Sequence, residues 1–194
     1  MVFRERTYSV LLVSSSDKFN TTVTAMLPPS EYWPVQTAAT AAKARGLLSE
    51  QDYDIVMINA PLSDESGTEL AQRAGSASHT CVLMLVKSEL FESASSKLTE
   101  YGVMTLAKPT NAAMMSQALR ALCAMREKAR LIEDKQATLE EKMQEIRLVN
   151  RAKWTLIECL GMSEEEAQRY IVRRSQDLRI SKSETAKSII NTYN

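Results

Sequence analysis

The sequence predicts an α/β domain of five parallel strands alternating with five helices, followed by a long coiled-coil helix and an all-α domain of three helices. Short apolar runs alternate with amphipathic stretches over the first 110 residues, as in a parallel sheet with crossover helices. A stretch without proline or glycine then runs from about Met114 to Leu160, and two short helices follow it. We therefore expect three segments, at residues 1–113, 114–146 and 147–194.

The strands of the first segment are expected where short apolar runs are flanked by polar residues. These runs lie at 8–13, near Val35, at 55–58, at 82–86 and at 103–106. Amphipathic stretches between them predict helices at 18–27, 40–49, 67–73 and 92–101, with a last helix from Asn111 onward. The order of elements is that of a doubly wound parallel sheet.

The middle segment has a heptad pattern typical of a coiled coil. Apolar residues recur at the two seam positions, which are occupied by Leu122, Met125, Ala129, Ile132, Leu139, Met143 and Ile146, with the polar Gln136, Asn150 and Lys153 interspersed. In this register Lys128 and Lys135 take g positions and Glu133 and Glu140 take e positions, which attract across a parallel pair. We predict a parallel homodimer. The polar seam residues leave open a solvated helix packed on its own N-terminal domain.

The last segment contains two Ser-x-x-Glu capping boxes, which begin at Ser163 and Ser181. Gly161 is expected to end the helix before the first box, because glycine adopts a left-handed conformation without penalty. Each helix has one apolar stripe at helical spacing. The stripes consist of Val149, Ala152, Leu156 and Leu160; Ala167, Ile171 and Leu178; and Ala186, Ile189, Ile190 and Tyr193.

Charge is distributed unevenly along the chain. The whole sequence has 24 basic and 24 acidic residues, but residues 147–194 hold nine Lys or Arg against six Asp or Glu, a net charge of +3. Three of those acids lie together at one expected helix N-terminus, where the helix dipole favours them. The remaining surface is expected to be basic, which favours nucleic acid as a partner.

The spacing of residues in the last segment resembles the ANTAR domain, the RNA-binding module of bacterial transcription antiterminators. The resemblance is carried by Ala152-Lys153, Leu156, Glu166-Ala167, Ile171, Arg174-Ser175, Ala186 and Ile189-Ile190. It implies binding to paired RNA stem-loops in nascent mRNA, by a dimer that excludes a terminator hairpin. Gln168 departs from the family, which often has Tyr at this position, so Tyr170 or an arginine is expected to stack in its place.

The expected RNA-binding residues follow from this resemblance and from the chemistry of RNA. Basic side chains bind phosphates and make affinity depend on salt, whereas aromatic rings stack on loop bases. The set consists of Arg151, Lys153, Trp154, Arg169, Tyr170, Arg173, Arg174, Ser175, Arg179 and Lys182.

Residues 7–126 resemble a response-regulator receiver domain, which has a flavodoxin-like (βα)5 fold. The first strand ends in Leu11-Leu12-Val13-Ser14-Ser15, the third strand is Asp54-Ile55-Val56-Met57-Ile58-Asn59, Pro61 and Gly67 follow it, and the fifth strand ends at Lys108-Pro109. A working receiver needs carboxylates to hold Mg²⁺ and an aspartate to form the acyl phosphate.

The residues at the corresponding positions indicate a degenerate receiver. Ser14 and Ser15 replace the acidic pair, Asn59 occupies the phosphoacceptor position, and Val86 replaces the switch hydroxyl, whereas Lys108 is retained. An amide cannot form an aspartyl phosphate, so control by phosphorylation and a metal site are not expected. We expect Lys108 to bond to Asn59, with residual anion binding as the alternative. Regulation then falls to a regulatory protein partner, ligand binding or expression level.

Other polar residues receive structural interpretations. Asp17 and Asp64 are expected to cap helices or serve turns, and His79 to lie in a surface loop without a partner carboxylate. Cys81, Cys123 and Cys159 are widely spaced among apolar neighbours, which predicts buried thiols in a reducing compartment.

No cofactor, metal cluster or nucleophile and base pair is expected, so the chain is predicted not to be an enzyme. We also expect no signal peptide and no membrane span, and hence a cytoplasmic protein. Two alternatives to RNA binding remain: a DNA-binding transcription factor of the response-regulator type, and a protein-interaction adaptor.

Overall fold

The computed structural model describes residues 7–77 and 79–193. Residues 1–6, which begin the stretch where we expect no signal peptide, lie outside the described residues. The chain divides into two compact units, one up to Leu131 and one from Ile132 onward. The two units are described separately.

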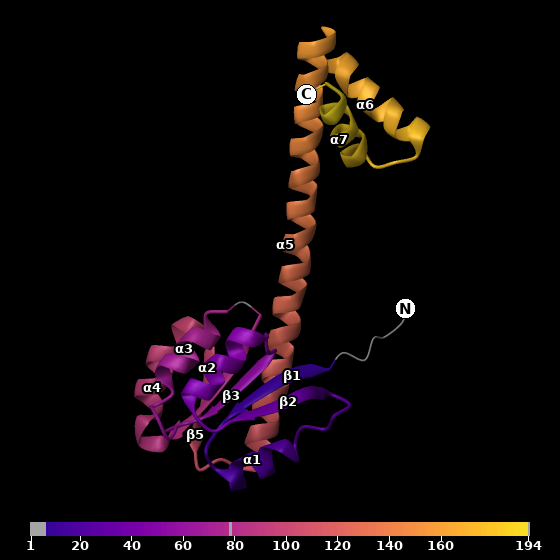
Figure 1. Ribbon diagram of the computed structural model, residues 1–194. Coiled ribbons are helices and arrows are strands. Elements are labelled where there is room, and N and C mark those ends of the chain that lie inside the picture. The colour runs from indigo at the N-terminus through magenta and orange to yellow at the C-terminus, as the bar shows by residue number, and fades with distance from the viewer. Residues whose placement is uncertain (1–6, 78, 194) are drawn as a thin grey trace. The chain divides into compact units, whose positions relative to one another are not determined.

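The N-terminal unit is built on a parallel sheet with strand order β2-β1-β3-β4-β5 (Figure 1). Its strands are β1 (Tyr8–Val13), β2 (Tyr32–Ala38), β3 (Ile55–Asn59), β4 (Cys81–Lys87) and β5 (Val103–Lys108). The predicted strand near Val35 is β2, which pairs with β1 at one edge. The flavodoxin-like fold class is confirmed.

Helices follow each strand, close to the predicted positions. They are α1 (Asp17–Thr24), α2 (Ala41–Glu50), α3 (Thr68–Gly75), α4 (Phe91–Leu98) and α5 (Ala112–Leu160). The predicted helix at 92–101 is divided: α4 ends at Leu98, and a 3-10 turn, η2 (Thr99–Tyr101), completes it. A second 3-10 turn, η1 (Ser88–Leu90), precedes α4.

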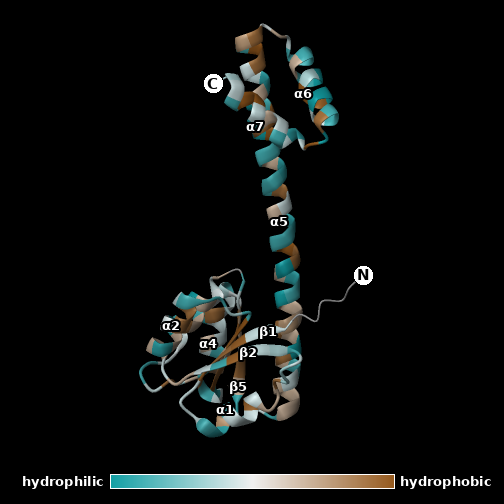
Figure 2. Ribbon diagram, turned by 45° about the vertical axis from the view of Figure 1, so that its right-hand side comes forward, coloured by the Kyte–Doolittle hydropathy of each residue, from teal (hydrophilic) through white to brown (hydrophobic). Residues whose placement is uncertain are grey.

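Apolar side chains alternate between the two faces of the sheet, as successive strand residues must. On one face Leu11 and Val13 pack with residues of α2, α3 and α4. On the other face Val10 and Leu12 pack with α1 and the first turns of α5. The buried strands are accordingly the hydrophobic centre of this unit (Figure 2).

The burial of Leu122 corrects one residue of the predicted coiled-coil seam. Its side chain is 0% exposed and lies in the core between α5 and the sheet, with Met115, Ala118 and Leu119. A partner helix cannot reach a side chain that is already packed on the sheet. Any seam therefore begins after Leu122.

The C-terminal unit consists of the last part of α5, α6 (Glu164–Leu178) and α7 (Lys182–Tyr193). Its core is small and contains Ala152, Leu156, Ala167, Ile171, Ala186, Ile189 and Ile190. Leu160 and Leu178, which we expected in the apolar stripes, are exposed. They are the last residues of α5 and α6, beyond the turns that face the core.

Both predicted capping boxes are present. The Ser163 hydroxyl accepts from the amide of Glu166 at 3.3 Å, and the Glu166 carboxylate accepts from the amide of Ser163 at 2.8 Å. Ser181 and Glu184 form the same pair of bonds at 3.1 and 2.9 Å. Gly161 follows α5 with a φ of 66°, as predicted.

None of the helices in the described ranges combines the length and the apolar character needed to cross a membrane.

Candidate functional site

The exposed basic residues of α6 are the clearest candidate contacts for an anionic partner. Arg169 and Arg173 are exposed and one helical turn apart, and Arg173 Nε lies 4.0 Å from the Asp177 carboxylate. Together with Tyr170, Glu166 and the turn at Gly161 they line an open hollow of about 570 Å³. This surface offers two cations and an aromatic ring beside one carboxylate.

Tyr170 and Arg174 are held to each other on α6. An Arg174 guanidinium N–H donates to the Tyr170 hydroxyl at 2.7 Å, and the guanidinium carbon lies 5.8 Å from the centre of the ring. Arg174 is half-buried, and its Nε has no hydrogen-bond partner within the described residues. Arg174 therefore orients the ring and is less available than Arg173.

The predicted residues of α5 differ in accessibility. Arg151 is exposed, and Trp154 is 63% exposed. By contrast, the Lys153 side chain is largely covered, and its Nζ donates to the Glu164 carboxylate at 3.0 Å. Lys153 joins α5 to the start of α6, so its charge is already partly neutralised.

Arg179 and Lys182 flank the turn between α6 and α7 and are exposed. Arg179 adopts a left-handed conformation with a φ of 52° at the end of α6. Ser175 does not belong to this surface. Its side chain is buried and its hydroxyl donates to the Val172 carbonyl at 2.8 Å, so the prediction that it contacts RNA is not supported.

At the carboxyl end of the sheet, three of the expected pocket residues are joined by hydrogen bonds: the neutral Ser14 and Asn59 and the cation Lys108. The Asn59 amide donates to the Ser14 hydroxyl at 3.0 Å, and Lys108 donates to the Asn59 carbonyl oxygen at 2.9 Å, as predicted. Ser14 and Val86 are buried and Ser15 is exposed. Burial and the nearby Lys87 lower the pKa of Lys108.

Asp64 has the capping role predicted for it. Its carboxylate accepts hydrogen bonds from the amides of Ala41 at 2.9 Å and Ala42 at 3.0 Å, and these bonds lower its pKa. Asp17 lies in the first turn of α1, whose cap is Ser16. Asp17 is therefore at a helix end, whereas Asp64 caps α2 from the loop between β3 and α3.

His79 lies in a turn with a partly exposed side chain, as expected for a surface loop, but its Nε2 lies 2.9 Å from the Asp52 carboxylate. Cys81 is buried as expected and Cys123 is half-buried, but Cys159 is exposed near the end of α5. Among residues 7–77 and 79–193, no three Asp, Glu, His or Cys side chains cluster as metal ligands.

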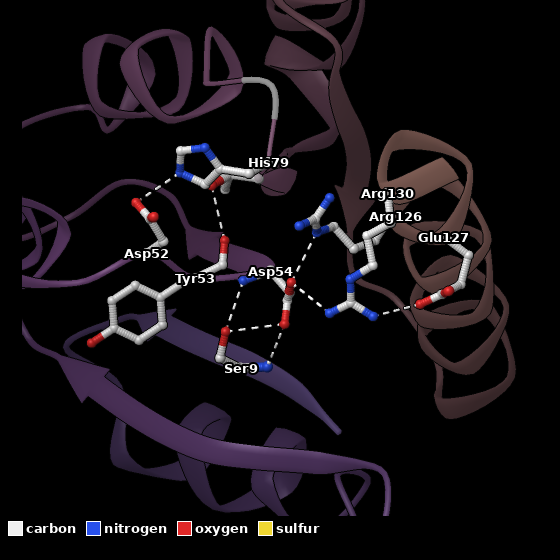
Figure 3. A network of polar contacts seen from close by, with 9 residues as sticks. Ser9, Asp52, Tyr53, Asp54, His79, Arg126, Glu127 and Arg130 are labelled. Atoms are coloured by element: carbon white, nitrogen blue, oxygen red, sulfur yellow. Dashed lines mark hydrogen bonds and ion pairs between the residues drawn. The ribbon is translucent and has the colours of Figure 1, made fainter. Parts of the chain in front are cut away.

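A polar network at the amino end of β3 was not predicted from the sequence (Figure 3). Asp54 accepts from the amide of Ser9 at 3.0 Å and from Arg126 and Arg130 at 2.8 Å each. Burial alone would raise the pKa of Asp54, but the bonds from Arg126 and Ser9 and the charge of Arg130 lower it. The signal was available, because Arg126 and Arg130 are one turn apart on α5.

The same network encloses Tyr8. The Arg130 guanidinium lies 5.1 Å from the centre of the Tyr8 ring and also bonds Glu127 at 2.6 Å. Burial and a hydrogen bond with Glu127 raise the pKa of Tyr8 to about 12. These contacts attach α5 to β1 and β3.

Most of the remaining seam residues are accessible. Met125, Ile132, Leu139, Met143 and Ile146 are between 41% and 60% exposed, whereas Ala129 is half-buried. Large apolar side chains at heptad spacing form an exposed apolar stripe along one helix, and contact of such a stripe with water is unfavourable.

Comparison with known proteins assigns the two ends of the chain separately. Residues 137–190 match the ANTAR domain family. No curated protein matches the chain significantly.

Several solved structures share the fold of the N-terminal unit. An adenylate cyclase from Rhodopirellula baltica is 22% identical with a TM-score of 0.59, over 70% of this chain and 98% of that one. A signal receiver domain of an HD domain-containing protein from Pseudomonas fluorescens Pf-5 is 23% identical with a TM-score of 0.56, over 67% and 96%. A chemotaxis response regulator of Vibrio cholerae is 22% identical with a TM-score of 0.52, over 60% and 99%.

At these identities the likeness extends to the fold alone, and the cyclase activity belongs to the Rhodopirellula protein. The chain therefore combines an N-terminal unit of the response-regulator receiver fold with a segment, residues 137–190, that matches the ANTAR domain.

Proposed function

We propose that this protein is an RNA-binding antitermination regulator that binds paired stem-loops in nascent mRNA in the cytoplasm. The observation that carries the proposal is the ANTAR match at 137–190, in a unit with exposed arginines on α6. Phosphates attract such cations, and unpaired loop bases stack on aromatic rings. The proposed role is regulatory and not catalytic.

Within this proposal, Arg169 and Arg173 are the principal phosphate contacts. Both are exposed, and Glu166 next to them is engaged in the capping box. Trp154 and Tyr170 are the proposed stacking rings, with Arg174 orienting Tyr170. Arg151, Arg179 and Lys182 add exposed positive charge, and Lys153 contributes less because of its ion pair with Glu164.

We further propose that the active species is a parallel dimer formed through α5. The exposed stripe from Met125 to Ile146 gives the apolar seam. In a parallel pair, Lys135 of one helix faces Glu140 of the other, which fixes the register at a gain of only tenths of a kcal/mol. A dimer presents two RNA-binding units, which suits paired stem-loops.

Control of this dimer is proposed to be independent of aspartyl phosphorylation. Asn59 has an amide where a carboxylate must form the acyl phosphate, and Ser14 and Ser15 supply no charge to hold Mg²⁺. The amide is moreover already bonded to Ser14 and Lys108. A regulatory protein partner or a ligand is left as the source of the signal.

RNA binding is tested by titrating the full chain with fluorescent paired stem-loops and with duplex DNA at two salt concentrations. We expect saturable binding to the stem-loops that weakens as salt rises. Preference for duplex DNA would favour a transcription factor of the response-regulator type. Binding to neither nucleic acid would favour a protein-interaction adaptor.

The proposed surface is tested by Arg169→Ala and Arg173→Ala, separately and together. Each change removes one cation, so the double variant should lose affinity at both salts and show a salt slope reduced by about two phosphate contacts. Arg73→Ala, an exposed arginine of α3, is the matched control and should bind normally. Unaltered affinity in the double variant removes α6 from the interface.

The dimer is tested by sedimentation of Leu139→Asp and Leu131→Asp. Leu139 lies on the seam and Leu131 does not, although both are about 60% exposed. A buried, unpaired carboxylate disfavours association, so only Leu139→Asp should shift the protein towards monomer. A wild-type monomer at all concentrations, or equal effects of both changes, would contradict the proposed seam.

A further inference from the structure

We propose that the cavity beside Lys108 binds a small organic monocarboxylate with an apolar body. The cavity has a volume of about 590 Å³ and lies between α1, the carboxyl end of β3 and the loop that joins β5 to α5. It is within the N-terminal unit, and the inference does not depend on RNA binding. Its size is in the range of ordinary small-molecule sites.

Charge at the cavity is positive and uncompensated. Lys108 is half-buried there and bonds only neutral groups, the Asn59 amide oxygen and the Ala60 carbonyl. Within the described residues, no carboxylate forms an ion pair with Lys108, and Lys87 adds a second positive charge nearby. Lys18 also lines the cavity, but Lys18 and Lys87 are exposed, so Lys108 is the partly desolvated cation, and one such cation favours a single negative charge on a ligand.

Two further features at the mouth of the cavity favour an anionic head group. Thr110 lines the cavity, and its hydroxyl is buried without a hydrogen-bond partner among the described residues. Asn111 and Ala112, at the start of α5, also line it, so the positive end of that helix dipole is close. A carboxylate head group can pair with Lys108 near this helix end.

The remaining wall accepts an apolar body. It is formed by Phe19 and Val23 of α1, by Met26 in the turn that follows α1, and by Met115 of α5. Val23 and Met115 are nearly fully buried, so the wall is part of the packed core. A head group held by one cation and an aliphatic or aromatic body against this wall is the pattern of a specific small-molecule site.

Ligand in this cavity would touch the first turn of α5 through Ala112 and Met115. The candidate ligand site therefore lies where a working receiver would be phosphorylated, beside Asn59 and Lys108, and α5 forms part of its wall.

The test is isothermal titration of the full chain with acetate, butyrate and hexanoate, with 1-hexanol and inorganic phosphate as comparison probes. Affinity should rise from acetate to hexanoate by about fourfold for each added CH₂. Hexanol should bind more weakly than hexanoate, because it cannot pair with Lys108. Equal affinity for acetate, phosphate and hexanoate, or for hexanol and hexanoate, would overturn the proposal, as would the absence of binding.

Two variants locate the site. Lys108→Met keeps the length of the side chain but removes its charge, and should weaken hexanoate at least about tenfold. Ala112→Phe fills the cavity without changing charge and should also weaken it. Lys43→Met, an exposed lysine of α2, is the control and should leave affinity unchanged. Thermal unfolding of each variant verifies that it is folded, and wild-type hexanoate affinity in both site variants would refute the assignment.

Discussion

The two units of this protein are stabilised in different ways. The receiver-like unit buries both faces of its sheet and holds a half-buried carboxylate, Asp54, between two arginines. The three-helix unit has a core of seven small or medium apolar residues and two capping boxes. Distant contacts therefore support the first unit, and local signals support a larger share of the second. A small core contributes less to the free energy of unfolding, so the loss of one side chain removes a larger share of it.

The largest expected effect comes from removing one buried leucine from each core. Leu156→Ala and Leu83→Ala each delete a fully buried side chain and should each cost about 2–5 kcal/mol. Because small domains have little stability to lose, Leu156→Ala should unfold the three-helix unit, whereas Leu83→Ala should leave a weakened but folded receiver-like unit.

Hydrogen exchange resolved by peptide separates the two outcomes. Loss of protection confined to α6 and α7 in Leu156→Ala, with normal protection of the sheet, is the expected pattern. Simultaneous unfolding of both units in either variant would show that they unfold as one cooperative unit. It would contradict the view that the two units are stabilised separately.

Asp54→Asn should weaken the receiver-like unit in a pH-dependent manner. Because the folded pKa of Asp54 is lowered, its charge contributes stability that is present above the unfolded pKa of about 3.9 and is lost as pH falls through the folded value. At neutral pH we expect a loss of about 1–3 kcal/mol, since hydrogen bonds to a charged group are removed.

The difference in urea unfolding between wild type and Asp54→Asn should shrink as pH falls below about 4. Asp52→Asn is the control, since its carboxylate is exposed and pairs with His79. A difference that stays constant between neutral and acidic pH would mean that the charge of Asp54 does not support the fold.

Removing a cap should have a smaller effect, limited to the three-helix unit. Ser163→Ala should cost about 0.5–2 kcal/mol, because the amide of Glu166 loses its acceptor. Ser188→Ala, at an exposed interior position of α7, should be neutral or slightly stabilising. Equal thermal midpoints for the two variants would argue that the cap contributes nothing.

The smallest expected effects are a pair of opposite sign at two helix ends. Gly161 and Arg179 both have positive φ, and among the described residues nothing beyond the chain neighbours of Gly161 lies within 4 Å of a Cβ built there. Gly161→Ala should therefore destabilise by about 1 kcal/mol through backbone strain alone, and Arg179→Gly should stabilise by a similar amount.

Thermal unfolding checks both changes, and RNA titration adds a second measurement for Arg179→Gly. A more stable variant with weaker RNA binding would separate the structural cost of Arg179 from its proposed contact. Destabilisation by Arg179→Gly would show that its side chain, and not its backbone, supports the turn.

Local patterns in the sequence determined much of the architecture. The capping boxes at Ser163 and Ser181 and the glycine at 161 set helix ends that agree with the structure, because their hydrogen bonds join residues only three apart. The apolar runs likewise located the strands. That Ser14, Ser15 and Asn59 carry no charge was likewise visible without a structure.

Only the tertiary structure decided which side chains are accessible. Leu122 fits the heptad as well as Ile132 does, yet one is buried on the sheet and the other is exposed. Likewise Ser175 and Arg173 are near neighbours on α6, but the first faces the core and the second faces water. Asp54 bonds Arg126 and Arg130, which lie more than 70 positions away in the sequence. Lys108 bonds Asn59, which lies 49 positions away. Such pairs depend on how the chain folds back on itself, which no local spacing records.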